Sequence, residues 1–99
     1  MPPHHPKYNK PLPAKDFFAL KPGDKYVIYW AKDDDVRDLR LNFAVQTVDS
    51  IIGSLNDPHG LTIFPDDEGY EWTSHEMIEP GDNTLDTSRG YAYLFRYEP

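Results

Sequence analysis

The chain has no cysteine in its 99 residues, which excludes disulfide bonds and thiolate metal sites. No apolar run approaches the ~20 residues that a membrane-spanning helix needs, and the first residues lack the apolar core of a signal peptide. A chain of this length supports one modest hydrophobic core. We therefore expect a single-domain cytoplasmic protein with no membrane partner.

The motifs of nucleophilic and phosphate chemistry are also absent. There is no Gly-x-Ser-x-Gly elbow, and the six glycines stand singly, so no glycine-rich phosphate loop is present. Asp-rich loops offer oxygen ligands, but their spacing matches no calcium loop, and ordinary turn chemistry accounts for them. The sequence thus predicts no catalytic residue, no metal site and no cofactor, and it favours a non-enzyme while leaving an enzyme open.

Acidic residues, in contrast, are abundant and unevenly placed. Residues 1–32 hold six lysines and two acids, a sum of +4, whereas residues 33–99 hold four arginines and fifteen acids, a sum of −11. A basic lead-in on an acidic body predicts either an arm that folds over its own domain or a surface for a cationic partner. A solvated surface that keeps a small protein in solution is the simpler explanation of any single acidic cluster.

Proline divides the chain into an arm and a body. Residues 1–13 contain five prolines and almost nothing to bury, so we expect a flexible, proline-rich basic arm. Residues 14–99 are predicted to form one acidic β-rich domain.

Strand patterns dominate this body. Residues 25–31 and 90–98 are rich in aromatic and aliphatic residues on both faces, which is typical of inner strands. Residues 39–48 alternate apolar and mostly polar side chains, which predicts a strand covered on one side. Further predictions are short strands over 61–64 and 70–79, two helical turns over 14–20, a helix or a strand over 48–55, and a loop over 80–89. The fold class is therefore mainly β (β-rich α+β): a small antiparallel sheet or partly open barrel of about five strands, with one or two short helices.

One short segment resembles a known motif. Residues 89–94, Arg-Gly-Tyr-Ala-Tyr-Leu, are similar to the first six positions of the ribonucleoprotein octapeptide of RNA-recognition-motif domains. The match ends at Arg96, where that octapeptide has an aromatic residue, and a net charge of −7 lacks the basic footprint of a polyanion binder. We assign no family and expect no direct nucleic-acid binding.

The leading functional hypothesis is a small, acidic, non-enzymatic binding protein that occupies a basic site on another protein. Inhibitors, nucleic-acid mimics and viral accessory proteins are classes consistent with it, because exposed carboxylates steer association with a cationic groove. The candidate partner-binding residues are Asp33, Asp34, Asp35, Asp66, Asp67 and Glu68.

Two alternatives stay open. An aromatic sheet face could bind a small ligand or a carbohydrate through Trp72, His75, Tyr91 and Tyr97, with Trp72 and Tyr97 expected to be exposed and Trp30 in the core. Alternatively, a small enzyme could use His75 with a nearby carboxylate or a tyrosine. The oligomeric state is also open, with a homodimer among the alternatives.

Overall fold

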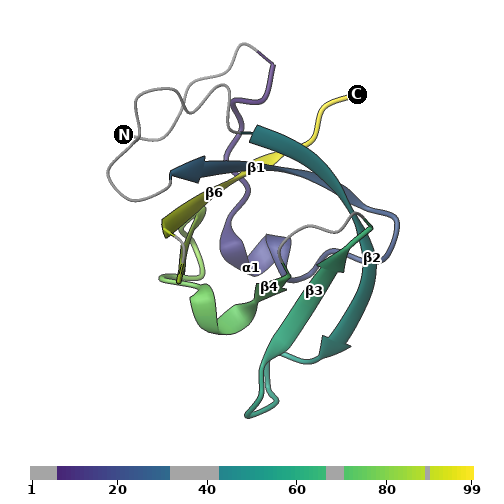
Figure 1. Ribbon diagram of the computed structural model, residues 1–99, viewed down its shortest axis with the longest axis vertical. Helices are drawn as coiled ribbons and strands as arrows, with labels where there is room; N and C mark the ends of the chain where they lie inside the picture. The colour runs from purple at the N-terminus through teal and green to yellow at the C-terminus, as the bar shows by residue number, and fades with distance from the viewer. Residues whose placement is uncertain (1–6, 32–42, 67–70, 89) are drawn as a thin grey trace.

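Six antiparallel strands form one sheet that curves into a half-barrel (Figure 1). The computed structural model describes residues 7–31, 43–66, 71–88 and 90–99. The strands are β1 (Lys25–Ala31), β2 (Phe43–Gly53), β3 (Leu61–Pro65), β4 (Trp72–Thr73), β5 (Thr84–Thr87) and β6 (Gly90–Arg96), in the order β4-β3-β2-β1-β6-β5. The predicted fold class is confirmed, with six strands in place of about five.

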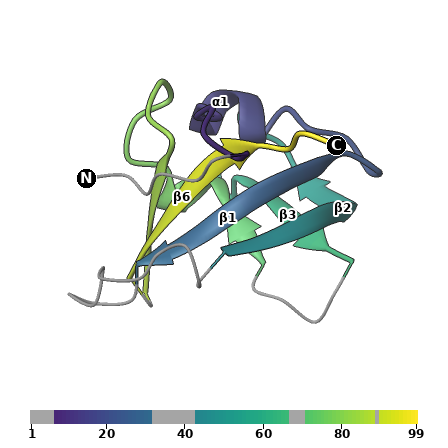
Figure 2. The same ribbon diagram turned by 90° about the horizontal axis from the view of Figure 1, so that it is seen from above.

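The described residues contain two short helical elements, α1 (Ala14–Phe17) and the 3-10 helix η2 (Ser74–Glu76). A single turn of helix is unstable in isolation, so tertiary packing must hold α1 in place. Phe17 is fully buried, and its ring centroid lies 4.9 Å from that of Tyr26 on β1. The helix therefore covers the concave side of the sheet (Figure 2). Neither element of the described chain is long and apolar enough to cross a membrane.

Strand β1 is buried on both faces, as its composition predicted. In β6 both faces are buried only toward the end of the strand, because Tyr91 near its start is 44% exposed. Ile28 and Leu94 point into the main core beneath α1, whereas Val27 and Phe95 belong to a second cluster on the convex face. Tyr8, Tyr93 and Tyr97 border that second cluster.

Strand β2 buries the face opposite to the expected one. The sequence pattern placed Phe43 and Val45 on the covered side, but these side chains are 36% and 39% exposed. The neighbouring residues Gln46 and Val48 are buried instead. Alternation alone therefore located the strand but assigned its inner face incorrectly.

A buried amide explains why this polar position can face the core. The Oε1 atom of Gln46 accepts hydrogen bonds from the Tyr26 hydroxyl at 2.8 Å and from the Trp72 Nε1–H at 3.0 Å. A buried polar group is tolerated when it is hydrogen-bonded. One side chain of β2 thus connects β1 and β4 through the core.

Three further predictions are settled by the structure. Residues 48–55, left open between helix and strand, continue β2 as far as Gly53. The strand predicted over 70–79 ends at Thr73, because the Thr73 N–H donates to Glu76 Oε1 at 2.9 Å in a capping box that starts η2. The loop predicted over 80–89 contains β5, which pairs with β6.

The described part of the proline-rich arm pairs with β6. The Leu12 N–H donates to the Leu94 carbonyl at 3.1 Å, and the Lys10 carbonyl accepts from the Arg96 N–H at 2.8 Å. The Leu12 side chain is only 3% exposed. The expectation that this segment has almost nothing to bury is therefore wrong for Leu12, and residues 10–12 extend the sheet beside β5.

The shared acceptor predicts a large effect of removing the Gln46 amide. Gln46→Leu leaves two buried donors without this acceptor and should lower the free energy of unfolding by about 2–4 kcal/mol in urea titrations. In the double variant Tyr26→Phe/Gln46→Leu one of those donors is gone, so its loss should be smaller than the sum of the single losses. Strict additivity would contradict the shared bond.

A second prediction concerns alkaline stability. Burial, and then the nearby Tyr8, raises the pKa of Tyr29 from 10.0 to about 12, so the folded protein favours the neutral phenol. Because the folded pKa lies above the unfolded one, this contribution is fully present below pH 10 and is lost as the pH rises toward 12. The loss amounts to about 2–3 kcal/mol.

The matched control is Tyr29→Phe, which keeps the ring and removes the titrating group. Urea titrations from pH 8 to 11 should show the wild type losing stability relative to Tyr29→Phe only above about pH 10. Parallel curves for the two proteins over the whole range would contradict the raised pKa.

Candidate functional site

The elements from β2 to β5 carry no lysine or arginine. Between Asn42 and Ser88 the sequence has ten acidic residues and neither basic type. Seven of these acidic residues are exposed, and within the described residues none of the seven takes part in an ion pair. We call these seven the acidic surface: Asp49, Asp57, Asp66, Glu71, Glu79, Asp82 and Asp86.

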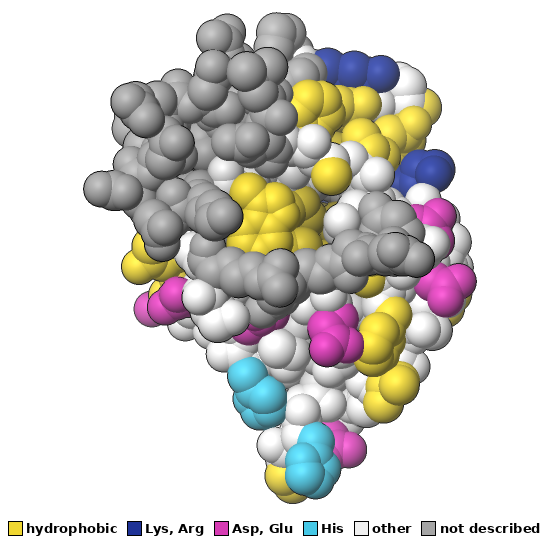
Figure 3. Space-filling model, viewed as in Figure 1, with side chains coloured by type: hydrophobic (Ala, Val, Ile, Leu, Met, Phe, Trp, Pro, Cys, Tyr) yellow, Lys and Arg dark blue, Asp and Glu magenta, His cyan; other side chains and the backbone are white. Residues whose placement is uncertain are grey.

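The face of the molecule in Figure 3 shows how the described charges lie. The Lys and Arg side chains visible there lie at the upper right, and the visible Asp and Glu side chains lie below them, over the middle and lower part. Glu98 and Asp16 have cationic partners: Lys10 Nζ lies 3.0 Å from Glu98 Oε1, and Arg96 Nη2 lies 3.4 Å from Asp16 Oδ2. These exposed pairs add little stability.

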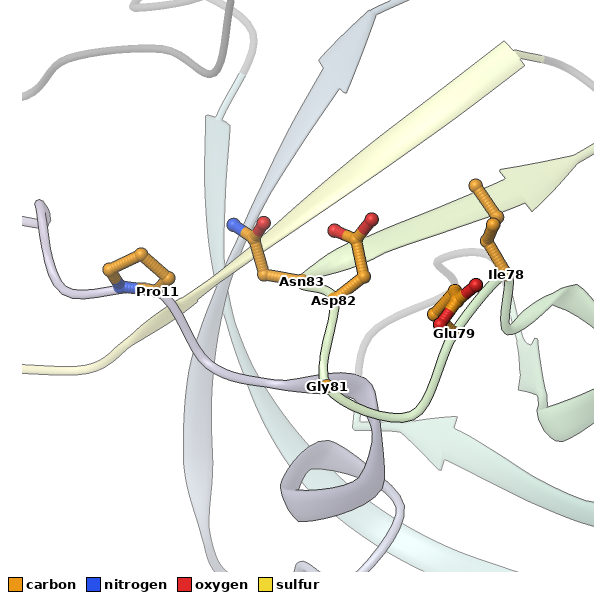
Figure 4. Close-up of a pocket in the computed structure, with 6 residues that line it drawn as sticks. All are labelled: Pro11, Ile78, Glu79, Gly81, Asp82 and Asn83. Atoms are coloured by element: carbon orange, nitrogen blue, oxygen red, sulfur yellow. The ribbon is translucent and has the colours of Figure 1, made fainter.

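Part of the acidic surface surrounds an open hollow of about 640 Å³ (Figure 4). The backbone of its loop is held by α1, because the Ala14 N–H donates to the Asp82 carbonyl at 2.7 Å and the Lys15 N–H donates to that of Pro80 at 2.9 Å. These bonds satisfy the first donors of the helix, which has no side-chain cap. The hollow is lined by Pro11, Ile78, Glu79, Gly81, Asp82 and Asn83.

The side chains of this hollow suit a cationic guest. Asp82, Asn83 and Ile78 extend to the same side of the loop (Figure 4). Asn83 is fixed by its own bond from Nδ2 to the Leu94 carbonyl at 3.0 Å. Two carboxylates, Asp82 and Glu79, can pair with an ammonium or guanidinium group while Ile78 contacts the apolar stem that carries it. The arrangement is chemically suited to a lysine or arginine side chain.

The predicted partner-binding residues are only partly described. Asp66 is exposed directly after β3, and its N–H donates to the Thr47 carbonyl at 3.0 Å, so its carboxylate is held at the surface. The other predicted residues, Asp33, Asp34, Asp35, Asp67 and Glu68, lie outside the described residues.

The expectation that Trp72 is exposed is wrong. Its side chain is fully buried, its Nε1–H is bonded to Gln46, and its ring centroid lies 5.3 Å from that of Trp30. Trp30, expected in the core, is the half-buried member of the pair. Because β4 packs this indole against the core, Trp72 offers no stacking face to a ligand.

The other residues of the aromatic alternative do not gather at one place. Tyr97 belongs to the border of the convex cluster, where its ring stacks on Tyr8 at 6.2 Å, whereas Trp72 lies in the core on the other side of the sheet. Tyr91 is 44% exposed on β6. His75 is exposed in η2, and the carboxylate of its neighbour Glu76 is used as a cap.

The described His, Asp and Glu side chains form no group that could hold a metal ion, because no three of them lie close enough together. No family model, no curated protein and no solved structure matches the chain. The site therefore rests on its own geometry.

Sequence reasoning missed the hollow but had a signal for the acidic surface. The absence of lysine and arginine from residues 42–88 is readable in the sequence. Nothing in the pattern places Pro11 beside Asp82, because that proximity comes from the pairing of the arm with β6.

The hairpin that carries Asp57 has a narrow base formed by backbone contact. Gly53 has a positive φ of 83°, and a side chain there would overlap the carbonyl oxygen of Gly60. At the tip, Asp57 Oδ1 accepts the His59 N–H at 3.0 Å, which stabilises the turn. This part of the acidic surface is thus positioned by a glycine.

A pair of glycine variants tests this close approach. Gly53→Ala should lower the free energy of unfolding by about 3 kcal/mol, through backbone strain and overlap with Gly60. Gly23 also has a positive φ, 98°, but nothing lies within 4 Å of an added Cβ. Gly23→Ala should therefore cost only about 1 kcal/mol. Equal losses of unfolding free energy for the two variants in urea titrations would contradict the close contact between Gly53 and Gly60.

Proposed function

We propose that the protein is a small, non-enzymatic binding protein that docks its acidic surface on a basic site of another protein. The observation that carries the proposal is the set of seven exposed carboxylates on consecutive elements that contain no lysine or arginine. Such a field attracts a cationic partner and raises its association rate. We further propose that the partner is met in the cytoplasm.

The hollow supplies a specific contact within this general field. Glu79 and Asp82 stand beside the exposed Ile78, so a lysine or arginine of the partner can form an ion pair there and cover apolar surface together. In a basic groove, the same lysine or arginine would normally contact the phosphates of a nucleic acid. The carboxylates of the hollow would take the place of those phosphates. The proposal therefore includes inhibitors that imitate a nucleic acid, among them viral accessory proteins.

A second candidate function is ligand binding on the convex aromatic face. Tyr8 stacks on Tyr97 and contacts Phe43 at 5.9 Å, and Phe43 is 36% exposed. Lys25 Nζ lies 6.0 Å from the Tyr97 ring centroid, which adds a cation beside the aromatic surface. A sugar or another ring ligand could stack there.

The leading proposal is tested by making the same charge change at two places, in the hollow and at the two ion pairs. Glu79→Gln/Asp82→Asn removes two charges from the hollow, and Asp16→Asn/Glu98→Gln removes two from the ion pairs, where both have cationic partners. With a partner captured from a host lysate, the first double variant should associate about tenfold more slowly at low salt, and the second should differ from wild type by less than about twofold.

Salt and competition complete the test. The association rate of the wild type should fall steeply with added salt, because exposed charges are screened within ~8 Å at physiological ionic strength. Nucleic acid that competes for the captured partner would support the mimic. Equal effects of the two double variants, or binding that is insensitive to salt and lost in Tyr97→Ala, would overturn the acidic-surface proposal in favour of the aromatic face.

A further inference from the structure

Strand β2 changes its hydrogen-bonding partner half-way along its length. Residues 43–47 pair with β1, whereas residues 48–53 pair with β3. The turn before β1 covers only the junction, where Val48 exchanges backbone bonds with Asp24 and Gly23 at 2.8 Å each. The pairing with β1 ends at Thr47, so beyond Val48 no described strand pairs with the edge of β2 that faces away from β3.

This edge is open to solvent. Among the described residues, the backbone of residues 49–53 forms hydrogen bonds with β3 and with no other element. Figure 1 shows this end of β2 along the outer side of the molecule, at the lower right. In an antiparallel pair, every second residue directs its N–H and C=O away from its partner, so these groups remain available to another chain.

A bulge places an apolar side chain beside this open edge. The pairing with β3 shifts register between Val48 and Ser50, so the strand has an extra residue at Asp49. Such a shift reverses which side chains face inward. Ile51 consequently packs against the core, and Ile52 is 63% exposed. Proteins usually protect an edge with lysine or proline, and residues 49–53 contain neither.

The charges around the edge select its occupant. Asp49 lies within it and Asp57 lies in the turn after it, both with exposed side chains, whereas Asp24 at its start is flanked by the exposed Lys21 and Lys25. A second copy of this chain would bring the same carboxylates and a net charge of −7 to the contact. A segment that carries lysine or arginine has the complementary charge, and an apolar side chain of that segment can cover Ile52.

We propose that residues 49–53 of β2 accept an extended, basic segment of the partner protein as an additional strand. This inference rests on the proposed function, because it identifies how the partner of the acidic surface is held. Backbone bonds to the edge supply affinity, while the alternation of basic and apolar side chains supplies specificity.

Backbone methylation of a probe peptide tests the strand addition directly. The probe is an alternating lysine–valine peptide of about eight residues. Two isomers of this peptide are N-methylated at every second residue, one at the odd and one at the even positions. Each isomer therefore loses the N–H groups along one of its two edges, and the two isomers carry the same charge. Strand addition predicts that one isomer binds at least about tenfold more weakly than the other.

Amide hydrogen exchange supplies a second readout on the protein. The unmethylated peptide should slow exchange at the outward-facing amides of residues 49–53. Equal binding of the two isomers, without added protection of these amides, would overturn strand addition. If both isomers bound equally and their binding weakened with added salt, strand addition would be overturned, but the proposal that the acidic surface binds a basic partner would still hold.

A matched pair of lysine variants locates the site on β2. Ile52→Lys and Val45→Lys each add one positive charge to an exposed position of this strand. On the edge that faces away from β3, the segment that contains Val45 is paired with β1, whereas the segment that contains Ile52 is not. Ile52→Lys should weaken peptide binding at least about tenfold, and Val45→Lys less than about threefold, since a lysine at the open edge repels and blocks the added strand. Equal effects would overturn the assignment to residues 49–53.

Sedimentation of the protein without peptide completes the experiment. A monomer is expected for both the wild type and Ile52→Lys, because the carboxylates around the edge oppose self-pairing. A dimer that Ile52→Lys dissociates would overturn the proposal, since the edge would then be filled by a second copy of the chain.

Discussion

The structure depends on one buried oxygen. Gln46 Oε1 accepts bonds from Tyr26 on β1 and Trp72 on β4, so it connects the centre of the sheet with its edge across the core. Two donors on large aromatic side chains would otherwise be buried without this partner, which is costly in a low-dielectric interior. These bonds stabilise the orientation of β2 in which Gln46 faces inward. In that orientation Phe43 and Val45 point outward on the convex side.

The strands that could be predicted from sequence are those whose pattern needs no distant partner. The apolar runs of β1 and β6 identify inner strands on any sheet. The inner face of β2 could not be predicted, because a glutamine is a core residue only where tyrosine and tryptophan donors converge on it. Strand β5 was missed because its four residues contain one aliphatic side chain, Leu85, which is too little for a strand pattern. The strand forms through its pairing with β6.

The acidic character of the site was readable from sequence, but its geometry was not. Composition alone identifies a long stretch without cations, and Asp66 was correctly expected at the surface end of a strand. Trp72 was predicted wrongly because its burial comes from the pairing of β4 with β3. Strand β4 has only two residues, too few to give a recognisable sequence pattern. The hollow requires Pro11 and the loop 78–83 to meet, and that meeting is a consequence of β6 pairing with the arm.

The pairing of β1 with β6 bears on how the chain acquires its fold. Tyr26 pairs with Arg96, seventy positions later, whereas on its other side Tyr29 pairs with Phe43 after only fourteen. During synthesis, β1, β2 and β3 can therefore assemble as a meander before β6 is made. One edge of β1 is unpaired during that time. Topologies dominated by such distant contacts fold slowly, because the loop-closure entropy is lost before the contacts form. Until β6 is made, this edge of β1 lacks its partner, and an unpaired strand edge is prone to aggregation.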